Sequence, residues 1–158
     1  MMKRRQLLPI ALLSFSFLTT QAQNSIVITT PKQMKFTKSD SKTILHGMET
    51  VVLQGELNKA GPYTVRIKLP SHYLVAPHTH PSVEALTVIS GTMYLGMSDK
   101  FDQNKVIALP AGTFILVPAM APHFVFSKNE GLITQVNADG PRKMDFIAGG
   151  PQSGPMKK

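Results

Sequence analysis

The chain has 158 residues and a formal net charge of +8 at pH 7, with 17 Lys and Arg against 9 Asp and Glu. It contains no Cys, which excludes disulfide bonds, thiolate metal ligands and cysteine nucleophiles. The basic residues are scattered, without a dense run or interleaved aromatic residues, so the composition argues against nucleic-acid binding. A chain of this length can form one compact domain with a real core.

The first residues predict an export signal. Residues 1–5 are basic, and an apolar run from Leu7 to Leu18 is interrupted by Pro and Ser. This run is shorter than the roughly 20 residues that a membrane-spanning helix needs. Small residues follow, so we predict a signal peptide over residues 1–22 that is cleaved near Ala22, with an uncleaved anchor as the alternative. The mature protein would be periplasmic or secreted, without a stable membrane anchor, and the export route stays open between general secretion and twin-arginine export.

Residues 23–42 predict an N-terminal strand and a polar arm. The β-branched run from Ile26 to Thr30 is typical of a strand, and Pro31 would end it. At the other end of the chain, residues 141–158 are rich in Gly, Pro, Ser and Lys, and this composition predicts a disordered tail.

Residues 43–140 predict a single all-β domain. Short runs rich in β-branched residues recur between Gly and Pro at spacings of about 8–12 residues, which is typical of a sandwich or barrel. Apolar and polar residues alternate from Tyr63 to Leu69, as in a half-buried strand. This alternation places Arg66 outside the barrel; the alternative is that Arg66 binds a substrate carboxylate.

Four side chains predict a site for one divalent transition metal. His78, His80 and Glu84 lie at even offsets, so an extended strand would project them to the same side. His123 follows a strand-like run and a Pro-bounded turn, and it would join them if the two strands pair. Imidazoles with one carboxylate suit Mn, Fe, Ni, Cu or Zn better than Ca or Mg, which prefer oxygen ligands. The remaining histidines, His46 and His72, are interpreted as surface or structural residues.

The same segments resemble the two motifs of the cupin superfamily. The first motif is His-x-His, three or four residues, Glu, six residues and Gly; the second is Gly, five residues, Pro-x-Gly, two residues and His. The matching residues are His78, His80, Glu84, Gly91, Gly112, Pro118 and His123. Met120 stands where the second motif usually has Gly, and Ser127 where it often has Asn, which leaves the ligand set intact. The resemblance is to small bacterial single-domain exported proteins of the cupin type-2 kind, and it implies a double-stranded β-helix, or jelly-roll barrel.

Two classes of function stay open. The first is a metal-dependent oxidoreductase of the dioxygenase type that acts on a small, partly apolar molecule. The second is a non-catalytic cupin that binds or senses a small molecule and holds a structural metal. No second positioned acid or base is evident, although Glu49 and Glu56 could lie at the mouth, so no catalytic residue is assigned.

An apolar pocket is expected around the metal, although a residue in such a position is more often plain barrel core than a substrate contact. The residues expected there are Leu86, Val88, Met93, Leu95, Phe114, Leu116, Met120 and Val125. The β-rich outer faces also permit a homodimer.

Overall fold

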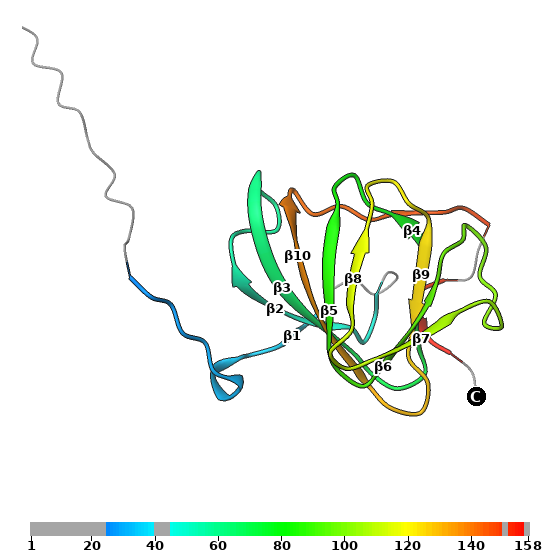
Figure 1. Ribbon diagram of the computed structural model, residues 1–158, viewed down its shortest axis with the longest axis horizontal. Coiled ribbons are helices and arrows are strands. Elements are labelled where there is room, and N and C mark those ends of the chain that lie inside the picture. The colour runs from blue at the N-terminus through cyan, green and yellow to red at the C-terminus, as the bar shows by residue number, and fades with distance from the viewer. Residues whose placement is uncertain (1–24, 40–44, 150–151, 157–158) are drawn as a thin grey trace, which may run out of the picture.

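The computed structural model describes residues 25–39, 45–149 and 152–156 (Figure 1). The predicted signal peptide over residues 1–22 therefore lies outside the described residues, and so do parts of the predicted arm and the first two residues of the predicted domain. In the described ranges, no helix is long and apolar enough to cross a membrane.

Two antiparallel sheets face each other across one core (Figure 1). The first sheet has the order β1 (Thr37–Lys38), β2 (Glu49–Gln54), β3 (Gly61–Leu69), β10 (Leu132–Gly140), β5 (Glu84–Ser90) and β8 (Phe114–Val117). The second sheet has the order β11 (Asp145–Phe146), β4 (Tyr73–Thr79), β9 (His123–Phe126), β6 (Thr92–Gly96) and β7 (Ile107–Pro110), and β12 (Gly154–Pro155) also pairs with β4. The prediction of an all-β jelly roll is confirmed.

The core lies between the sheets because successive side chains of each strand point to opposite faces. In β3, Tyr63, Val65, Ile67 and Leu69 are buried, as the alternation predicts, and the residues between them are more exposed. Val136 of β10 lies opposite Val65 and is also buried. Each such apolar side chain contributes about 1.5–3 kcal/mol through burial.

The strand predicted from Ile26 to Thr30 is wrong. These residues carry no strand assignment, and Ile26, Val27 and Ile28 are exposed. A short 3-10 helix, η1 (Pro31–Gln33), follows and is capped by hydrogen bonds from Thr30 to the Gln33 side chain. β-branched composition favours a strand only where a neighbouring strand is available to pair, and in the described part of the arm only Thr37–Lys38 pairs.

The disordered tail predicted for residues 141–158 is also wrong for the described part of that segment. β11 and β12 both pair with β4, and Ala76 N donates a hydrogen bond to Ser153 Oγ at 2.8 Å. Met156 N donates to His72 O at 2.6 Å. The composition of this segment favours disorder, but it does not show that β4 offers a free edge on which the segment can order.

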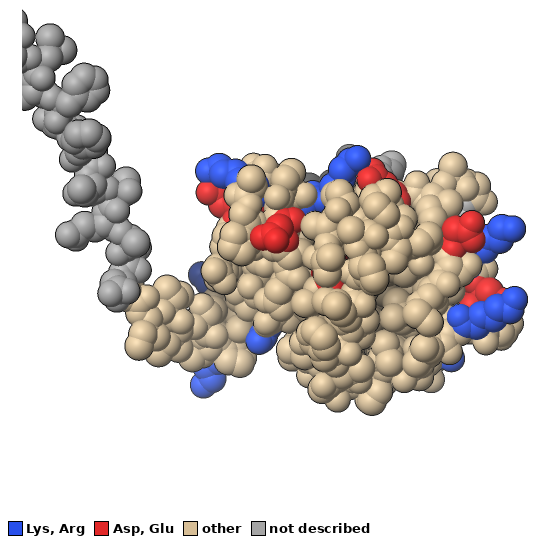
Figure 2. Space-filling view, turned by 45° about the horizontal axis from the view of Figure 1, so that its top comes forward, with Lys and Arg blue, Asp and Glu red and all other residues tan. Residues whose placement is uncertain are grey.

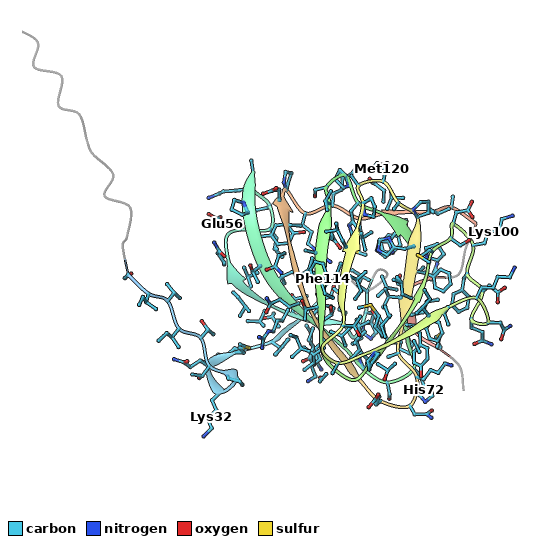
Figure 3. The ribbon with its side chains drawn as sticks, in the orientation of Figure 1. Lys32, Glu56, His72, Lys100, Phe114 and Met120 are labelled. Atoms are coloured by element: carbon cyan, nitrogen blue, oxygen red, sulfur yellow. The ribbon has the colours of Figure 1, made fainter. Side chains whose placement is uncertain are left out.

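Three residues expected to line the pocket point away from it. Phe114, Leu116 and Met120 are 65%, 59% and 60% exposed (Figure 3). β8 pairs with β5 so that Ile115 lies opposite the buried Leu86. Phe114 and Leu116, one residue to either side, therefore point to the outer face; a register shifted by one residue would turn them inward. The other expected residues, Leu86, Val88, Met93, Leu95 and Val125, are buried.

Met120 is expected to be replaceable by Gly with a gain in stability. Its φ of 59° lies in the left-handed region, where a Cβ costs about 1–2 kcal/mol, and its exposed side chain loses little packing when removed. Allowing for the higher chain entropy of Gly, we expect Met120→Gly to raise the free energy of unfolding by up to about 1 kcal/mol in urea titrations. Met97→Gly is the control, because Met97 is exposed with a negative φ, and it should destabilise. A loss of stability in Met120→Gly would contradict the assignment of strain.

Candidate metal centre

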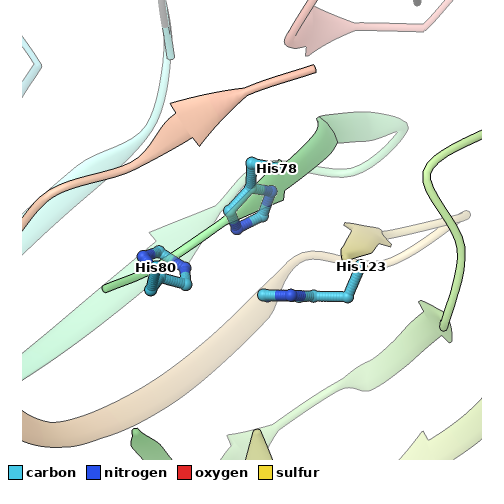
Figure 4. A group of neighbouring side chains, drawn as sticks. All are labelled: His78, His80 and His123. Atoms are coloured by element: carbon cyan, nitrogen blue, oxygen red, sulfur yellow. The ribbon is translucent and has the colours of Figure 1, made fainter. Parts of the chain in front are cut away.

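The ends of three strands bring the four predicted ligands to the same part of the barrel interior. His78 lies near the end of β4 and pairs in register with His123, the first residue of β9. His80 follows β4 directly, and Glu84 is the first residue of β5. Figure 4 shows the three imidazoles around a common space. All four side chains are buried, with exposed fractions of 4% or less.

The three imidazoles are close enough to hold one ion. Their ligand atoms all lie within 4.8 Å of one another, and Glu84 Oε2 is 3.4 Å from His80 Nε2. Two ligands that each lie about 2.1 Å from an ion can be up to about 4.2 Å apart, so small rotations suffice. The exposed His46 and the half-buried His72 lie outside this cluster.

Backbone carbonyls orient each ring. Nδ1 of His78 lies 2.7 Å from Ala76 O, and Nδ1 of His80 lies 2.7 Å from Lys143 O. Nδ1 of His123 lies 3.0 Å from Ala121 O. A carbonyl oxygen only accepts hydrogen bonds, so each Nδ1 carries the proton and each Nε2 keeps its lone pair for a ligand. Lys143 belongs to the segment that the sequence predicted to be disordered.

Burial keeps the imidazoles neutral. It lowers the pKa of His78 to about 3, and the neighbouring His123 and His80 add to the effect. Burial also lowers the pKa values of His80 and His123. For Glu84, burial raises the pKa, whereas the Arg142 guanidinium opposes the rise. Neutral imidazoles are the form that binds metals, and a cation would relieve the cost of the buried carboxylate. The donor set therefore fits a divalent transition metal.

Two further polar residues lie beside the predicted ligands, one in the cavity wall and one next to it. Arg142 lines the cavity together with the four predicted ligands. Tyr63 is buried nearby: burial and the Glu84 carboxylate raise its pKa to about 12, and Arg142 opposes this rise. Tyr63 carried a sequence signal as an inward residue of β3, but Arg142 carried none, since its segment matched neither motif.

Three residues considered for the site lie elsewhere. Arg66 is on the outer face, where Nε donates to Gln135 Oε1 at 3.1 Å. Glu49 Oε2 lies 3.3 Å from Lys68 Nζ, and Glu56 Oε1 lies 2.7 Å from Lys59 Nζ. Neither acid lines the cavity, so Glu84 is its only carboxylate among the described residues.

A sequence profile of the family described as Cupin matches residues 49–148, which include all four predicted ligands. The chain belongs to the cupin family. Germin-like protein 2-3 of Oryza sativa subsp. japonica is 33% identical to this cupin over an alignment of 99 residues that covers 52% of this chain and 44% of the relative. This cupin thus spans about half the length of the curated relatives it matches.

Solved structures share the fold of this cupin at low sequence identity. The polyketide cyclase RemF from Streptomyces resistomycificus aligns with a TM-score of 0.64 at 15% identity, covering 78% of this chain and 86% of that chain. A cupin 2 conserved barrel domain protein from Rhodopseudomonas palustris aligns with a TM-score of 0.56 at 13% identity, covering 74% and 81% of the two chains. These likenesses show the architecture, which hosts many functions.

The metal-free protein is expected to lose stability as the pH falls below 6.5. Unfolded histidines bind a proton near pH 6.5, whereas buried His78 stays neutral down to about pH 3, so the unfolded state binds more protons between these values. Each such group lowers the free energy of unfolding by up to about 1.4 kcal/mol per pH unit. The raised pKa of Glu84 acts in the opposite sense above pH 4.5, whereas the lowered pKa values of His78, His80 and His123 all act in the same sense.

Thermal unfolding in excess chelator between pH 7.5 and 5 measures this effect. The melting temperature should fall steadily below pH 6.5. A flat profile would show that the imidazoles take up protons in the folded state as readily as in the unfolded one.

Proposed function

We propose that this cupin binds one divalent transition metal ion through His78, His80, Glu84 and His123, and that it is an oxidoreductase of the dioxygenase type. The observation that carries the proposal is the cluster of buried imidazoles whose Nδ1 atoms are held by carbonyls, which leaves the Nε2 lone pairs facing one space. The donor set suits Mn, Fe, Ni, Cu or Zn, and a dioxygenase would exclude Zn because it is not redox active.

The residues around the site support chemistry done by a metal. When bound, a redox-active ion supplies activation of dioxygen, in a reaction that places both oxygen atoms in the product and needs no external reductant. The apolar side chains around the imidazoles, among them Met48, Leu69 and Val125, leave room for only a few water molecules in the cavity. Tyr63, with its pKa raised to about 12, stays protonated, and it lies beside Glu84 and Arg142 rather than in the cavity lining.

Hydrolysis by a pair of carboxylates has no support in the described lining. Glu84 is the single carboxylate there, and its Oε2 lies 3.4 Å from His80 Nε2, beside the three clustered imidazoles. A general acid and base pair needs two titratable groups with separate roles.

The alternative is a non-catalytic cupin that binds or senses a small molecule and uses the metal as a structural element. The cavity favours this reading in one respect, because its lining is largely apolar and offers few groups for proton transfer. Fold does not decide between the two: similar solved structures include the polyketide cyclase RemF and the DMSP lyase DddQ.

Elemental analysis of protein purified without an affinity tag, combined with oxygen uptake on a panel of small phenols, diketones and organic acids, tests the proposal. One equivalent of a redox metal and substrate-dependent oxygen uptake would support the oxidoreductase. One tightly held zinc ion without uptake would favour the binding role. Protein that takes up no divalent metal on titration would overturn both.

The proposal includes two further properties, export of the protein and a possible homodimer. Export with cleavage near Ala22 predicts a mature N-terminus at Gln23, which N-terminal sequencing of the secreted or periplasmic protein checks. A homodimer would bury the exposed Phe114 and Leu116 on the outer face of β8. On the face of the molecule in Figure 2, most of the charged side chains lie towards the edges. Light scattering that gives the monomer mass at all concentrations would rule out the dimer.

A further inference from the structure

The cavity at the metal centre is small and partly open to solvent. The centres of water-sized molecules can occupy about 50 Å³ of it. At about 10–15 Å³ for each water, this space holds roughly three to five water molecules. A ligand that fits without rearrangement therefore has only a few heavy atoms.

Arg142 brings a permanent positive charge to the wall of this cavity. Its backbone N donates to Leu57 O at 2.6 Å, which anchors the segment across the barrel mouth. Its Nη2 has a weak contact with Met144 Sδ at 3.5 Å, and its side chain is within hydrogen-bonding reach of the Tyr63 hydroxyl, whose pKa it lowers. Its Nε, however, is buried without a hydrogen-bond partner among the described residues. A buried N–H donor without a hydrogen-bond partner lowers the stability of the folded protein, so we expect a bound ligand to supply the missing acceptor.

The acidic residues in this region do not supply that acceptor. Across the described chain, no carboxylate lies within 4.0 Å of the Arg142 guanidinium. Asp145 is paired with Lys143 at 2.9 Å, and Asp139 is exposed. Glu84 is close enough for Arg142 to lower its pKa, but it lies beside His80 in the ligand cluster.

Charge balance points in the same direction. With a divalent ion in place, Glu84 is the one negative charge lining the cavity, whereas the ion and Arg142 together supply three positive charges. An excess of two positive charges in a largely apolar cavity is unfavourable unless a ligand offsets it. The guanidinium fork is well suited to bind a carboxylate.

We infer that Arg142 binds the carboxylate of the substrate or ligand, and that the ligand class is small carboxylic acids. The inference rests on the proposed function only for the position of the metal, since Arg142 would bind the anion whether or not a reaction follows. It assigns to Arg142 the specificity role that the sequence offered for Arg66, whose side chain is on the outer face.

Calorimetric titration of the zinc-loaded protein with acetate and with the neutral analogue acetamide tests the inference. We expect acetate to bind and acetamide not to bind detectably. Arg142→Gln should weaken acetate binding by about 10–100-fold, the range for loss of charge-assisted hydrogen bonds, with unchanged zinc content. The acetate affinity of Arg142→Lys should lie between those of the wild type and Arg142→Gln, because Lys keeps the positive charge but lacks the two parallel N–H donors of the guanidinium. Arg66→Gln is the matched control and should bind acetate as the wild type does.

Three results would overturn the inference. The first is equal binding of acetate and acetamide, and the second is an unchanged acetate affinity in Arg142→Gln. The third is loss of zinc from Arg142→Gln, which would make Arg142 part of the metal site instead. The proposed function fails separately. If acetate binding depends on Arg142 but no oxygen uptake is found, the oxidoreductase is refuted and the inference is supported. The same conclusion holds if a protein without metal binds acetate through Arg142.

Discussion

Glu84→Gln is expected to lower the affinity for a divalent metal by at least about 100-fold and, at the same time, to stabilise the metal-free protein at pH 7. Loss of the residues that merely orient metal ligands costs about 10–100-fold, so loss of the only anionic ligand should cost more. In the metal-free state the buried carboxylate is a burden, as its raised pKa shows, and a neutral amide of the same shape removes that burden. Competition with a chromogenic chelator measures the affinity, and thermal unfolding in excess chelator measures the stability.

His72→Ala is the control for this variant. His72 lies at the start of the strand that carries His78, but its side chain is outside the ligand cluster. It should keep the wild-type affinity for the metal. Equal affinities in Glu84→Gln and the wild type would remove Glu84 from the ligand set, and a less stable metal-free Glu84→Gln would show that the carboxylate has a favourable partner within the protein.

The all-β class and the shared face of His78 and His80 could be predicted because their signals are local, whereas the jelly roll and the place of His123 came from the resemblance to the two cupin motifs. Alternation in β3 determines which of its side chains face the core. His78 and His80 share a face through the same periodicity, and the Pro-bounded turn before His123 marks the start of β9. Each signal lies within about ten residues of the side chain that it places.

The rest of the site could not be predicted because it depends on pairing between distant segments. His80 Nδ1 is held by Lys143 O, 63 residues further along the chain. The same segment carries Arg142 into the cavity, although its composition is typical of disorder. The apolar Phe114 and Leu116 were expected inside, but the register of β8 on β5 turns them outward, and nothing within β8 itself encodes that register.

In the N-terminal arm, the sequence predicted a strand where the structure has none. Ile26, Val27 and Ile28 have strong β-propensity, yet they remain exposed and carry no strand assignment. The tail with its Gly, Pro and Ser residues pairs with β4 instead. In both segments the availability of a strand edge decided the outcome, and propensity did not.

Truncation after Gly140 is expected to weaken metal binding by about 10–100-fold and to destabilise the fold. It removes the Lys143 carbonyl that orients His80, and the loss of such a partner has this cost in other metal sites. It also removes β11 and β12, and with them the hydrogen bonds of β4 to the tail, including the one from Ile147 N to Pro77 O at 2.9 Å. Chelator competition and urea unfolding measure the two effects.

Truncation after Gly149 separates the two roles of the tail. This variant keeps Arg142, Lys143 and β11 but loses β12 and the Ser153 hydroxyl that accepts from Ala76 N. We expect it to be less stable than the full chain but to bind the metal with nearly the same affinity, because the partner of His80 remains. If truncation after Gly140 changed neither property, the tail would be dispensable, as its composition alone suggests. If both truncations lost the metal equally, β12 and not the Lys143 carbonyl would be the element that holds the site in place.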